Sequence, residues 1–190
     1  MEKITDWNSL WRELVEIRAR SRKSDPGGGQ PDIWSDRAHK FDAGVKRRWA
    51  KPDSSRDFIL SRLDSSSTVL DIGAGTGAWS ALLAPSVRHV TAVEPSPAMI
   101  EGMRRRLTAE NIANVTIVQG AWPDDAVEPH DFSLCSHAMY GCPDLAAFIR
   151  HMAVSTRHEC FLLMRAPTFD GVMAEAAQHI WRHPLDSPNF

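Results

Sequence analysis

The ten residues Thr68–Gly77 have the sequence TVLDIGAGTG and are followed by AWSALL at Ala78–Leu83. The first part, TVLDI, is apolar or β-branched apart from its acid, which is typical of a buried parallel strand. The second part, GAGTG, places glycines at alternate positions before a helical pattern begins. Glycines between a strand and a helix allow a tight turn and a close approach of backbone to ligand. The stretch therefore predicts a ligand-binding loop at the N-terminus of a helix.

A second strand is predicted at His89–Val93, and it ends at Glu94, about 20 residues after the glycine loop. A carboxylate at this position can accept hydrogen bonds from both hydroxyls of a ribose. Gly73–Ala78 also satisfies the dinucleotide pattern G-x-G-x-x-A, but Asp71 weighs against that ligand because it would repel a pyrophosphate. The same charge would attract the amino group of a sulfonium ligand. We therefore favour S-adenosylmethionine over a dinucleotide.

The stretch Val69–Gly77, VLDIGAGTG, resembles motif I of the class I (Rossmann-like) S-adenosylmethionine-dependent methyltransferases. Glu94 matches the acidic residue after that family's second strand, and the resemblance extends from Trp34 to Pro167. It implies an α/β fold, a Rossmann-like three-layer sandwich with a mostly parallel sheet, and S-adenosyl-L-methionine as cofactor. The loop and the resemblance together give these expected cofactor-binding residues: Phe41, Asp71, Gly73, Ala74, Gly75, Gly77, Glu94, Pro95, Ser96, Met99, Gly120, Ala121, Trp122 and His137.

An aromatic pair precedes the glycine loop. Trp34–Asp42, WSDRAHKFD, resembles the W-x-x-x-A-x-x-[YF]-D helix found before motif I in many small-molecule methyltransferases of this class. The resemblance implies that Phe41 lies near the methionine end of the cofactor, with Trp34 beside it. The alternative is that both rings anchor the core. We expect residues 32–49 to be helical.

Two further stretches should approach the ligand after Glu94. Ser96 is a predicted N-cap with proline at the first helical position, and the resemblance places Ser96 and Met99 near the ligand, although Met99 equally suits the core. After the third predicted strand, at residues 114–120, the family often has Gly-Asp-Ala. This chain has Gly-Ala-Trp at 120–122, so the acid that accepts from adenine is missing. Backbone groups, stacking of Trp122, or an acid at 124 or 125 could replace it.

The fourth strand is predicted at 131–137, and ligands of open α/β sheets bind outside the carboxyl ends of strands. His137 stands at this end and is the best candidate for a general base or orienting group, because histidine titrates near neutral pH. Tyr140 is the second candidate catalytic residue. The alternative for His137 is a cofactor-contacting or structural histidine whose hydrogen bonds are satisfied within the protein.

The remaining segments complete the expected sheet and its helices. A helix is predicted over 52–63, with inward-facing Phe58, Ile59 and Leu63. A second should span 144–154, with Leu145, Phe148, Ile149 and Met152 toward the sheet. A fifth buried strand is expected at 159–166 and a last helix at 170–183. His179 and His183 share a face of that helix, but no third ligand is apparent, so we expect no metal.

Five strands are thus predicted, and the terminal antiparallel hairpin that the family normally has is not among them. An open edge at the fifth strand is a feature that natural proteins avoid. Either the sequence is a piece of a longer protein, or a partner chain, such as a second copy in a homodimer, covers that edge.

Two parts are predicted along the chain. Residues 1–30 combine an amphipathic helix at Ile4–Arg20 with a Gly/Pro hinge at 21–31, and 31–190 form the methyltransferase domain. The N-terminal helix either packs on the domain or serves as a lid over the ligand site.

Composition limits the remaining possibilities. With 190 residues, 43% hydrophobic and 24% charged, the chain suits one soluble globular domain. The net charge of −2 gives no overall basic field, and no amino-base or cytosine-C5 motif is present, so we expect no nucleic acid. Three cysteines favour reduced thiols. Without an apolar run of about 20 residues or a signal peptide, we expect no membrane segment and a cytoplasmic location.

These observations predict methyl transfer from S-adenosylmethionine to a small-molecule acceptor. The alternative is a catalytically inactive subunit that binds the cofactor or supports an assembly. A nicotinamide oxidoreductase is the third possibility, and it requires binding of NAD in place of S-adenosylmethionine. The acceptor itself cannot be identified from the sequence, because acceptor pockets of this fold vary through loops and termini.

Overall fold

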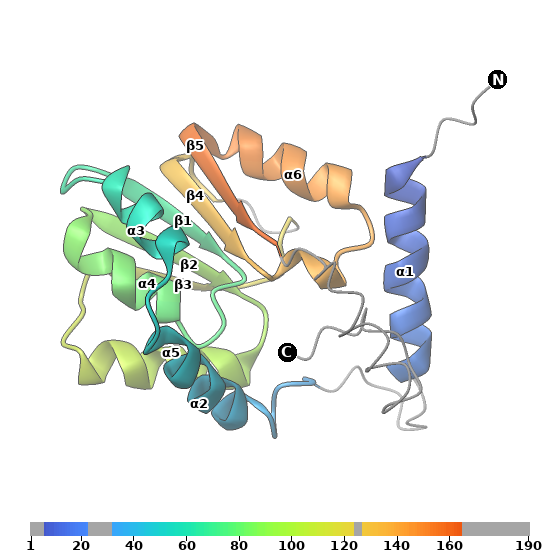
Figure 1. Cartoon of the computed structure of the whole chain (residues 1–190), viewed down its shortest axis with the longest axis horizontal. Helices are drawn as coiled ribbons and strands as arrows, with labels where there is room; N and C mark the ends of the chain where they lie inside the picture. The colour runs from blue at the N-terminus through green and yellow to red at the C-terminus, as the bar shows by residue number, and fades with distance from the viewer. Residues whose placement is uncertain (1–5, 23–31, 124–126, 165–190) are drawn as a thin grey trace.

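A computed structural model describes residues 6–22, 32–123 and 127–164 of the chain (Figure 1). The predicted helix at 170–183, with His179 and His183, lies outside the described residues. The helices are α1 (Trp7–Arg22), α2 (Ala38–Trp49), α3 (Ser54–Ser61), α4 (Ala78–Leu83), α5 (Pro97–Ala109) and α6 (Leu145–Val154). The strands are β1 (Thr68–Ile72), β2 (His89–Glu94), β3 (Val115–Gln119), β4 (His130–Ser136) and β5 (Thr156–Leu163), and two 3-10 turns are η1 (Ala84–Ser86) and η2 (Met139–Gly141).

The strands form one five-stranded sheet in the order β3-β2-β1-β4-β5, and every pairing is parallel. In register, Asp71 of β1 lies opposite Ala92 of β2 and Leu134 of β4. The order reverses at β1, so the connections after β1 and β4 leave the sheet in opposite directions, and ligands of open α/β sheets bind at such a point. The predicted α/β fold with a mostly parallel sheet is confirmed.

Apolar residues cover both faces of the sheet, as a parallel sheet requires. Val69 packs in a core cluster with Ile59 of α3 and Leu83 of α4. Its neighbour Leu70 packs on the opposite face with Phe148 of α6. Alternation along β1 therefore places α3, α4 and α5 on one side and α6 on the other, which gives the expected three layers (Figure 1).

The segment before α2 corrects one prediction. Residues 33–37 form a turn, and the helix begins at Ala38 rather than at residue 32. The Asp32 carboxylate accepts a hydrogen bond from the Trp34 N–H at 3.0 Å, and this local bond competes with helix formation. Trp34 therefore lies in the turn, whereas Phe41 lies on the helix.

Three side-chain and boundary predictions were also wrong. Phe58 is 57% exposed and Ile149 is 41% exposed, although both were expected to face inward. In α6, Phe148 and Met152 are four residues apart and share the buried stripe, so the residue next to Phe148 points away from it. The fifth strand spans Thr156–Leu163 rather than 159–166. Its first residues are polar and do not suggest a buried strand, but they pair with β4 from His130 onward.

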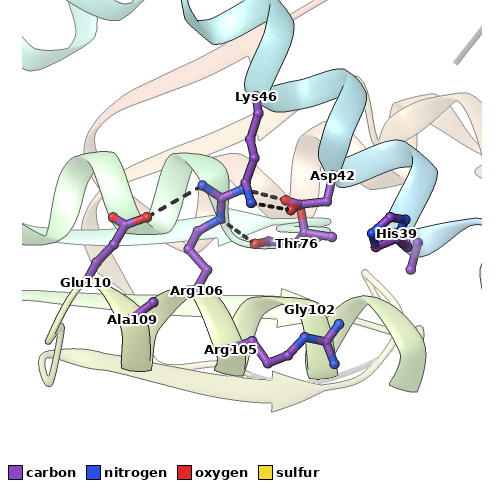
Figure 2. Close-up of a pocket in the computed structure, with 10 residues that line it drawn as sticks. His39, Asp42, Lys46, Thr76, Gly102, Arg105, Arg106, Ala109 and Glu110 are labelled. Atoms are coloured by element: carbon purple, nitrogen blue, oxygen red, sulfur yellow. Dashed lines mark hydrogen bonds and ion pairs between the residues drawn. The ribbon is translucent and has the colours of Figure 1, made fainter.

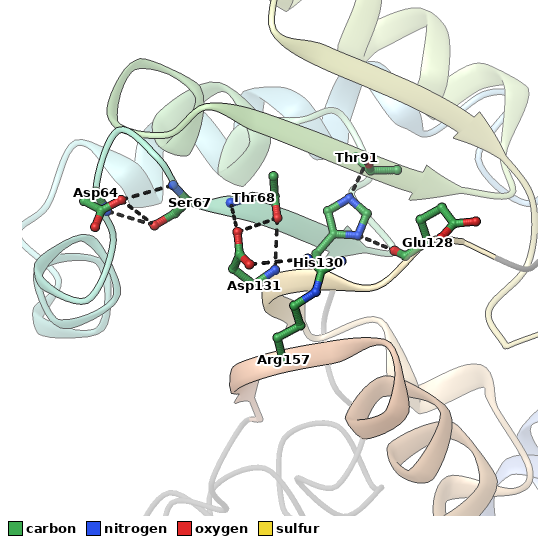
Figure 3. Close-up of polar contacts among 8 residues, drawn as sticks. All are labelled: Asp64, Ser67, Thr68, Thr91, Glu128, His130, Asp131 and Arg157. Atoms are coloured by element: carbon green, nitrogen blue, oxygen red, sulfur yellow. Dashed lines mark hydrogen bonds and ion pairs between the residues drawn. The ribbon is translucent and has the colours of Figure 1, made fainter.

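The amino ends of β1 and β4 are joined by polar side chains (Figure 3). The Asp131 carboxylate accepts from the Thr68 N–H at 2.9 Å and from the Thr68 hydroxyl at 2.8 Å. The His130 ring contacts the Thr91 hydroxyl at 2.7 Å through Nε2 and the Glu128 carbonyl at 2.6 Å through Nδ1. These bonds fix the strand starts at the edge opposite the predicted ligand site.

Helix α1 confirms the predicted N-terminal helix and packs near the carboxyl end of β4 and the start of α6 (Figure 1). No helix within the described residues has the length and apolar character needed to cross a bilayer. The strands at the sheet margins are β3 and β5. Because 165–190 lie outside the described residues, a partner over the β5 edge stays a prediction.

Candidate functional site

The glycine loop joins β1 to α4 and is held against the end of β2. The N–H groups of Gly73 and Ala74 both donate to the Val93 carbonyl, at 2.8 and 3.1 Å. All three alternate glycines of the loop have positive φ. At Gly73 an added Cβ would lie 2.1 Å from the Cβ of Ala138, so the loop and the tip of β4 approach too closely for any side chain.

Glu94 connects the loops that follow β1 and β2. Its Oε2 accepts from the Gly75 N–H and its Oε1 from the Ser96 N–H, both at 2.9 Å. The Glu94 side chain is buried, with 5% exposed, and burial raises its pKa. The two backbone N–H donors lower the pKa, and the negative charge of Asp32 raises it. Each carboxylate oxygen retains acceptor capacity, so the site can still bind hydroxyl donors.

Asp71 lies at the end of β1 and is 2% exposed. The Ser80 hydroxyl donates to its Oδ2 at 2.6 Å. Burial raises the pKa of Asp71 to about 6; the Ser80 hydrogen bond lowers it, and the charge of Glu94 raises it. A carboxyl that ionises only with difficulty favours a nearby cation, which is the electrostatic arrangement expected at a binding site.

The start of α5 confirms the predicted cap. Ser96 is the N-cap, its hydroxyl accepts from the Met99 N–H at 3.2 Å, and Pro97 occupies the first turn. The same hydroxyl donates to Asp32 at 2.7 Å. Ser96 and Met99 are both buried, whereas Pro95 is exposed at the strand end. The hydroxyl of Ser96 therefore has two partners within the protein, and its contact with a ligand stays a prediction.

The aromatic pair lies beside the glycine loop. The Phe41 and Trp34 rings meet edge to face with centroids 5.2 Å apart. The Phe41 Cε1 atom is 3.6 Å from the position that a Cβ on Gly75 would occupy. Both rings are half-buried. Phe41 is thus placed against the predicted cofactor loop, where it can contact a ligand or cover the backbone.

The end of β3 meets Glu94 through the backbone. The Gly120 N–H donates to the Glu94 carbonyl at 3.2 Å, and Ala121 is exposed just beyond it. Trp122 instead packs on α6: its Nε1–H donates to the Phe148 carbonyl at 3.3 Å, and its ring centroid is 4.7 Å from that of His151. A purine that stacks on Trp122 would therefore have to use the part of the ring that α6 leaves uncovered.

The two candidate catalytic residues are brought together at the tip of β4. The rings of His137 and Tyr140 stack with centroids 6.0 Å apart and planes 16° apart, and His137 Nδ1 is 3.3 Å from the Tyr140 hydroxyl. His137 is exposed and has a φ of 60°, which costs a non-glycine residue about 1–3 kcal/mol. Such strain concentrates at functional sites.

A salt-bridge network behind the glycine loop was not foreseen (Figure 2). Asp42 accepts from the Thr76 hydroxyl at 3.0 Å and from Arg106 at 2.5 Å, and it also pairs with Lys46 at 3.2 Å. Arg106 donates to the Thr76 carbonyl at 3.0 Å, so α2 and α5 both hold the loop. The final acid of the W-x-x-x-A-x-x-[YF]-D pattern was the available signal.

The same residues line a cavity of about 350 Å³ between α2 and α5. It includes Thr76 of the loop, but not Asp71 or Glu94, and therefore differs from the predicted cofactor site. The cations that line it, Lys46, Arg105 and Arg106, each pair with an acid of α2 or α5 or with Glu110. We assign this cavity no role in the reaction.

Comparisons with known proteins agree with this geometry. Residues 69–159 match the family described as "Methyltransferase domain". A magnesium-protoporphyrin O-methyltransferase of Rhodobacter capsulatus is 28% identical over 159 residues, which are 72% of this chain and 70% of that protein. A probable ribosomal RNA small subunit methyltransferase A of Methanosphaera stadtmanae is 26% identical over 91 residues, 47% of this chain and 32% of that protein.

Among solved structures, a S-adenosylmethionine-dependent methyltransferase of Thiobacillus denitrificans in complex with S-adenosyl-L-homocysteine has a TM-score of 0.52 and 24% identity. The match covers 67% of this chain and 55% of that one. The match shows the shared fold. Residues 69–159, which include most of the glycine loop's strand, the loop itself and Glu94, therefore resemble a methyltransferase domain of Rossmann-like fold. The family match and the S-adenosyl-L-homocysteine bound in that neighbour indicate S-adenosyl-L-methionine as the cofactor.

Proposed function

We propose that this protein transfers a methyl group from S-adenosylmethionine to a small-molecule acceptor. The observation that carries the proposal is Glu94, whose buried carboxylate joins the Gly75 N–H to the Ser96 N–H at the carboxyl edge of the sheet. Asp71 lies buried at the same edge with a raised pKa. These residues form a polar, negatively charged site on a tight backbone turn, which suits a nucleoside that carries positive charge.

The chain's residues have distinct proposed roles in holding the cofactor. The glycine loop gives the backbone close access, Glu94 accepts from the ribose hydroxyls, and Asp71 attracts the amino end. Phe41 covers the loop beside Gly75. The backbone at Gly120 and Ala121, just beyond β3, is proposed to bond the adenine.

The bound cofactor supplies a methyl group on a positively charged sulfur. The protein then contributes mainly by orienting the acceptor and excluding water from the site. His137 and Tyr140, in contact at the tip of β4, are proposed to orient the acceptor or to remove its proton. An acidic acceptor group needs no strong base, which is compatible with this small set of residues.

Two observations support a small acceptor over a nucleic acid. The net charge is −2, so the whole chain does not attract a polyanion. The relative that shares the longer alignment is named for a porphyrin substrate, while the relative named for ribosomal RNA aligns over less than half of this chain. Small acceptors are therefore the first class to test, and a structured RNA belongs in the same panel.

Calorimetry with S-adenosylmethionine, S-adenosylhomocysteine and NAD tests the cofactor part of the proposal. We expect binding of the first two and none of NAD. Transfer of a labelled methyl group to a panel of small acceptors and to structured RNA then tests the acceptor class. Label found only in RNA would overturn the small-acceptor proposal, and binding of NAD alone would overturn the cofactor assignment to this site.

A matched pair of variants tests the role of Glu94. Glu94→Gln leaves a single side-chain acceptor for two backbone N–H groups, so we expect at least about tenfold weaker cofactor binding. Glu101→Gln is the control because Glu101 is 58% exposed and pairs with Arg105 one turn along the surface of α5. Equal cofactor affinity of the two variants would show that Glu94 does not bind the cofactor.

A cofactor-binding subunit without turnover is the second candidate function. The favouring observation is the missing acid after Gly120, together with the packing of Trp122 on α6. This candidate predicts tight cofactor binding with no methyl transfer to any acceptor class.

A further inference from the structure

Helix α1 is fixed to the region after β4 by three polar contacts. The Trp11 indole N–H donates to the Cys142 carbonyl at 2.8 Å. The Asn8 side chain accepts from the Ala146 N–H at 3.2 Å, and that group belongs to the first turn of α6, where backbone donors lack helical partners. Arg12 pairs with Asp144, the N-cap of α6, at 3.6 Å.

These contacts, more than burial of an apolar stripe, determine how α1 docks. The helix exposes 76% of Trp7, 44% of Leu10 and 56% of Leu14, so among the described residues much of its apolar face is not covered. Trp11 is half-buried and lies on the side that faces the domain. A helix that merely covered the core would be expected to show the opposite distribution.

Trp11 begins a column of three aromatic rings. Its ring stacks on Tyr140 with centroids 6.1 Å apart and planes 28° apart. Tyr140 in turn stacks on His137, whose Nδ1 lies 3.3 Å from the tyrosine hydroxyl. The column runs from the N-terminal helix to the tip of β4, and near-parallel rings restrict one another's rotation.

The tip of β4 needs such support. His137 has a positive φ, and a residue in this region keeps its conformation only where its surroundings impose it. Its neighbour Ala138 is in tight contact with the glycine loop at Gly73. A small rotation at the tip would therefore alter both the acceptor side and the cofactor side.

We propose that Trp11 is a positioning residue that sets the orientation of His137 through Tyr140. The proposal rests on the proposed function, since it assigns α1 to the acceptor side of the same site. It makes the N-terminal helix a part of the site and gives Trp11 a role that the exposed Trp7 does not share.

The test uses nuclear magnetic resonance of the full chain with labelled histidine, with the His137 signals assigned by comparison with His137→Gln. The Tyr140 ring current should displace the His137 ring-proton signals. We expect Trp11→Ala to lose this displacement, Trp11→Phe to retain most of it by stacking alone, and Trp7→Ala to retain all of it. Circular dichroism on each variant checks that the domain remains folded.

Unchanged His137 signals in Trp11→Ala would overturn the proposal, and so would equal losses in Trp11→Ala and Trp7→Ala. Calorimetry with S-adenosylmethionine on the same samples separates this result from the proposed function. We expect cofactor binding to persist with at most a severalfold loss of affinity, because Trp11 contacts residues after β4 and reaches the glycine loop only through the tip of that strand. Should the wild-type chain bind no cofactor, the proposed function fails, while the ring-proton comparison still decides the role of Trp11.

Discussion

The two ends of the parallel sheet treat their carboxylates in opposite ways. At the carboxyl end, Asp71 is buried with one serine donor, and burial raises its pKa to about 6. At the amino end, the pKa of Asp131 is lowered, because the opposite effect of burial is outweighed by hydrogen bonds from Thr68 and Arg157. The strands β1 and β4 carry both environments within a few residues of each other.

The difference separates a carboxylate that stabilises the fold, Asp131, from one whose ionisation lowers the free energy of unfolding, Asp71. A shift from 3.8 to about 6 means that an ionised Asp71 costs about 3 kcal/mol of folding free energy at neutral pH. Asp131 contributes stability above its ordinary pKa and loses it as the pH falls. A buried carboxyl with this cost at the loop is what we expect of a residue that binds a ligand.

The largest expected effect is that of Gly73→Ala at the carboxyl end. The new Cβ would lie 2.1 Å from Ala138, at a backbone φ of 69° that alanine avoids. The loop or the tip of β4 must move, so we expect cofactor affinity to fall about 100-fold or more, with a loss of stability. Calorimetry and thermal unfolding measure the two effects.

Gly141→Ala is the matched control for that variant. An added Cβ at Gly141 meets no atom within 4 Å, and the residue lies in the turn after β4. We expect affinity and stability close to wild type. Similar losses in both variants would show that the connection after β4, and not the close contact at Gly73, limits binding.

Asp71→Asn should weaken the cofactor complex yet stabilise the free protein. Because the folded pKa is raised, the carboxyl favours folding fully below pH 3.8, and that contribution is lost as the pH rises through about 6. At pH 7.5 we expect the variant to be more stable by up to about 3 kcal/mol, with a smaller gain at pH 5. Denaturant unfolding at both pH values measures the gain.

Asp131→Asn provides the opposite result at the other end. It weakens the acceptor of the Thr68 N–H and hydroxyl, so we expect about 1–2 kcal/mol of destabilisation and unchanged cofactor affinity. If Asp71→Asn were also destabilising at pH 7.5, the contrast between the two ends would be wrong.

The central elements were predictable because local chemistry specifies them. The TVLDI strand, the glycine loop and the Ser96 cap each depend on residues that are adjacent in sequence. The contacts that complete the site are different: Asp32 reaches Ser96, and Trp11 reaches Cys142 across 131 positions. No periodicity in a single sequence reports which distant groups will meet.

The errors have a related cause. Phe58 and Ile149 were assigned to the core by hydrophobicity, but each lies beside a residue that already occupies the buried stripe, Ile59 and Phe148 respectively. The start of β5 was missed because edge strands can begin with polar residues, and only the pairing with β4 reveals it. Tertiary packing overrides composition in all three cases.

Arg106→Gln has an intermediate expected effect. The Arg106 side chain is 14% exposed and bonds to Asp42 and to the Thr76 carbonyl, so its loss leaves a half-buried carboxylate with fewer partners. We expect about 1–3 kcal/mol of destabilisation and severalfold weaker cofactor binding through the loop. Arg105→Gln, with the arginine 63% exposed, should change the stability by less than about 0.5 kcal/mol.

The smallest expected effect is a pH slope from His130 at the amino end. Burial lowers the pKa of His130, and the hydrogen bond to the Glu128 carbonyl only partly raises it again. The neutral ring therefore contributes its full stability above pH 6.5, and that stability is lost as the pH falls. Asp71 has the opposite slope over the same range and masks it in the wild-type chain. In the Asp71→Asn background, we therefore expect stability to fall between pH 7.5 and 5.5 more steeply than in Asp71→Asn/His130→Gln. Equal slopes in unfolding experiments would mean that His130 does not contribute to the difference between the two ends.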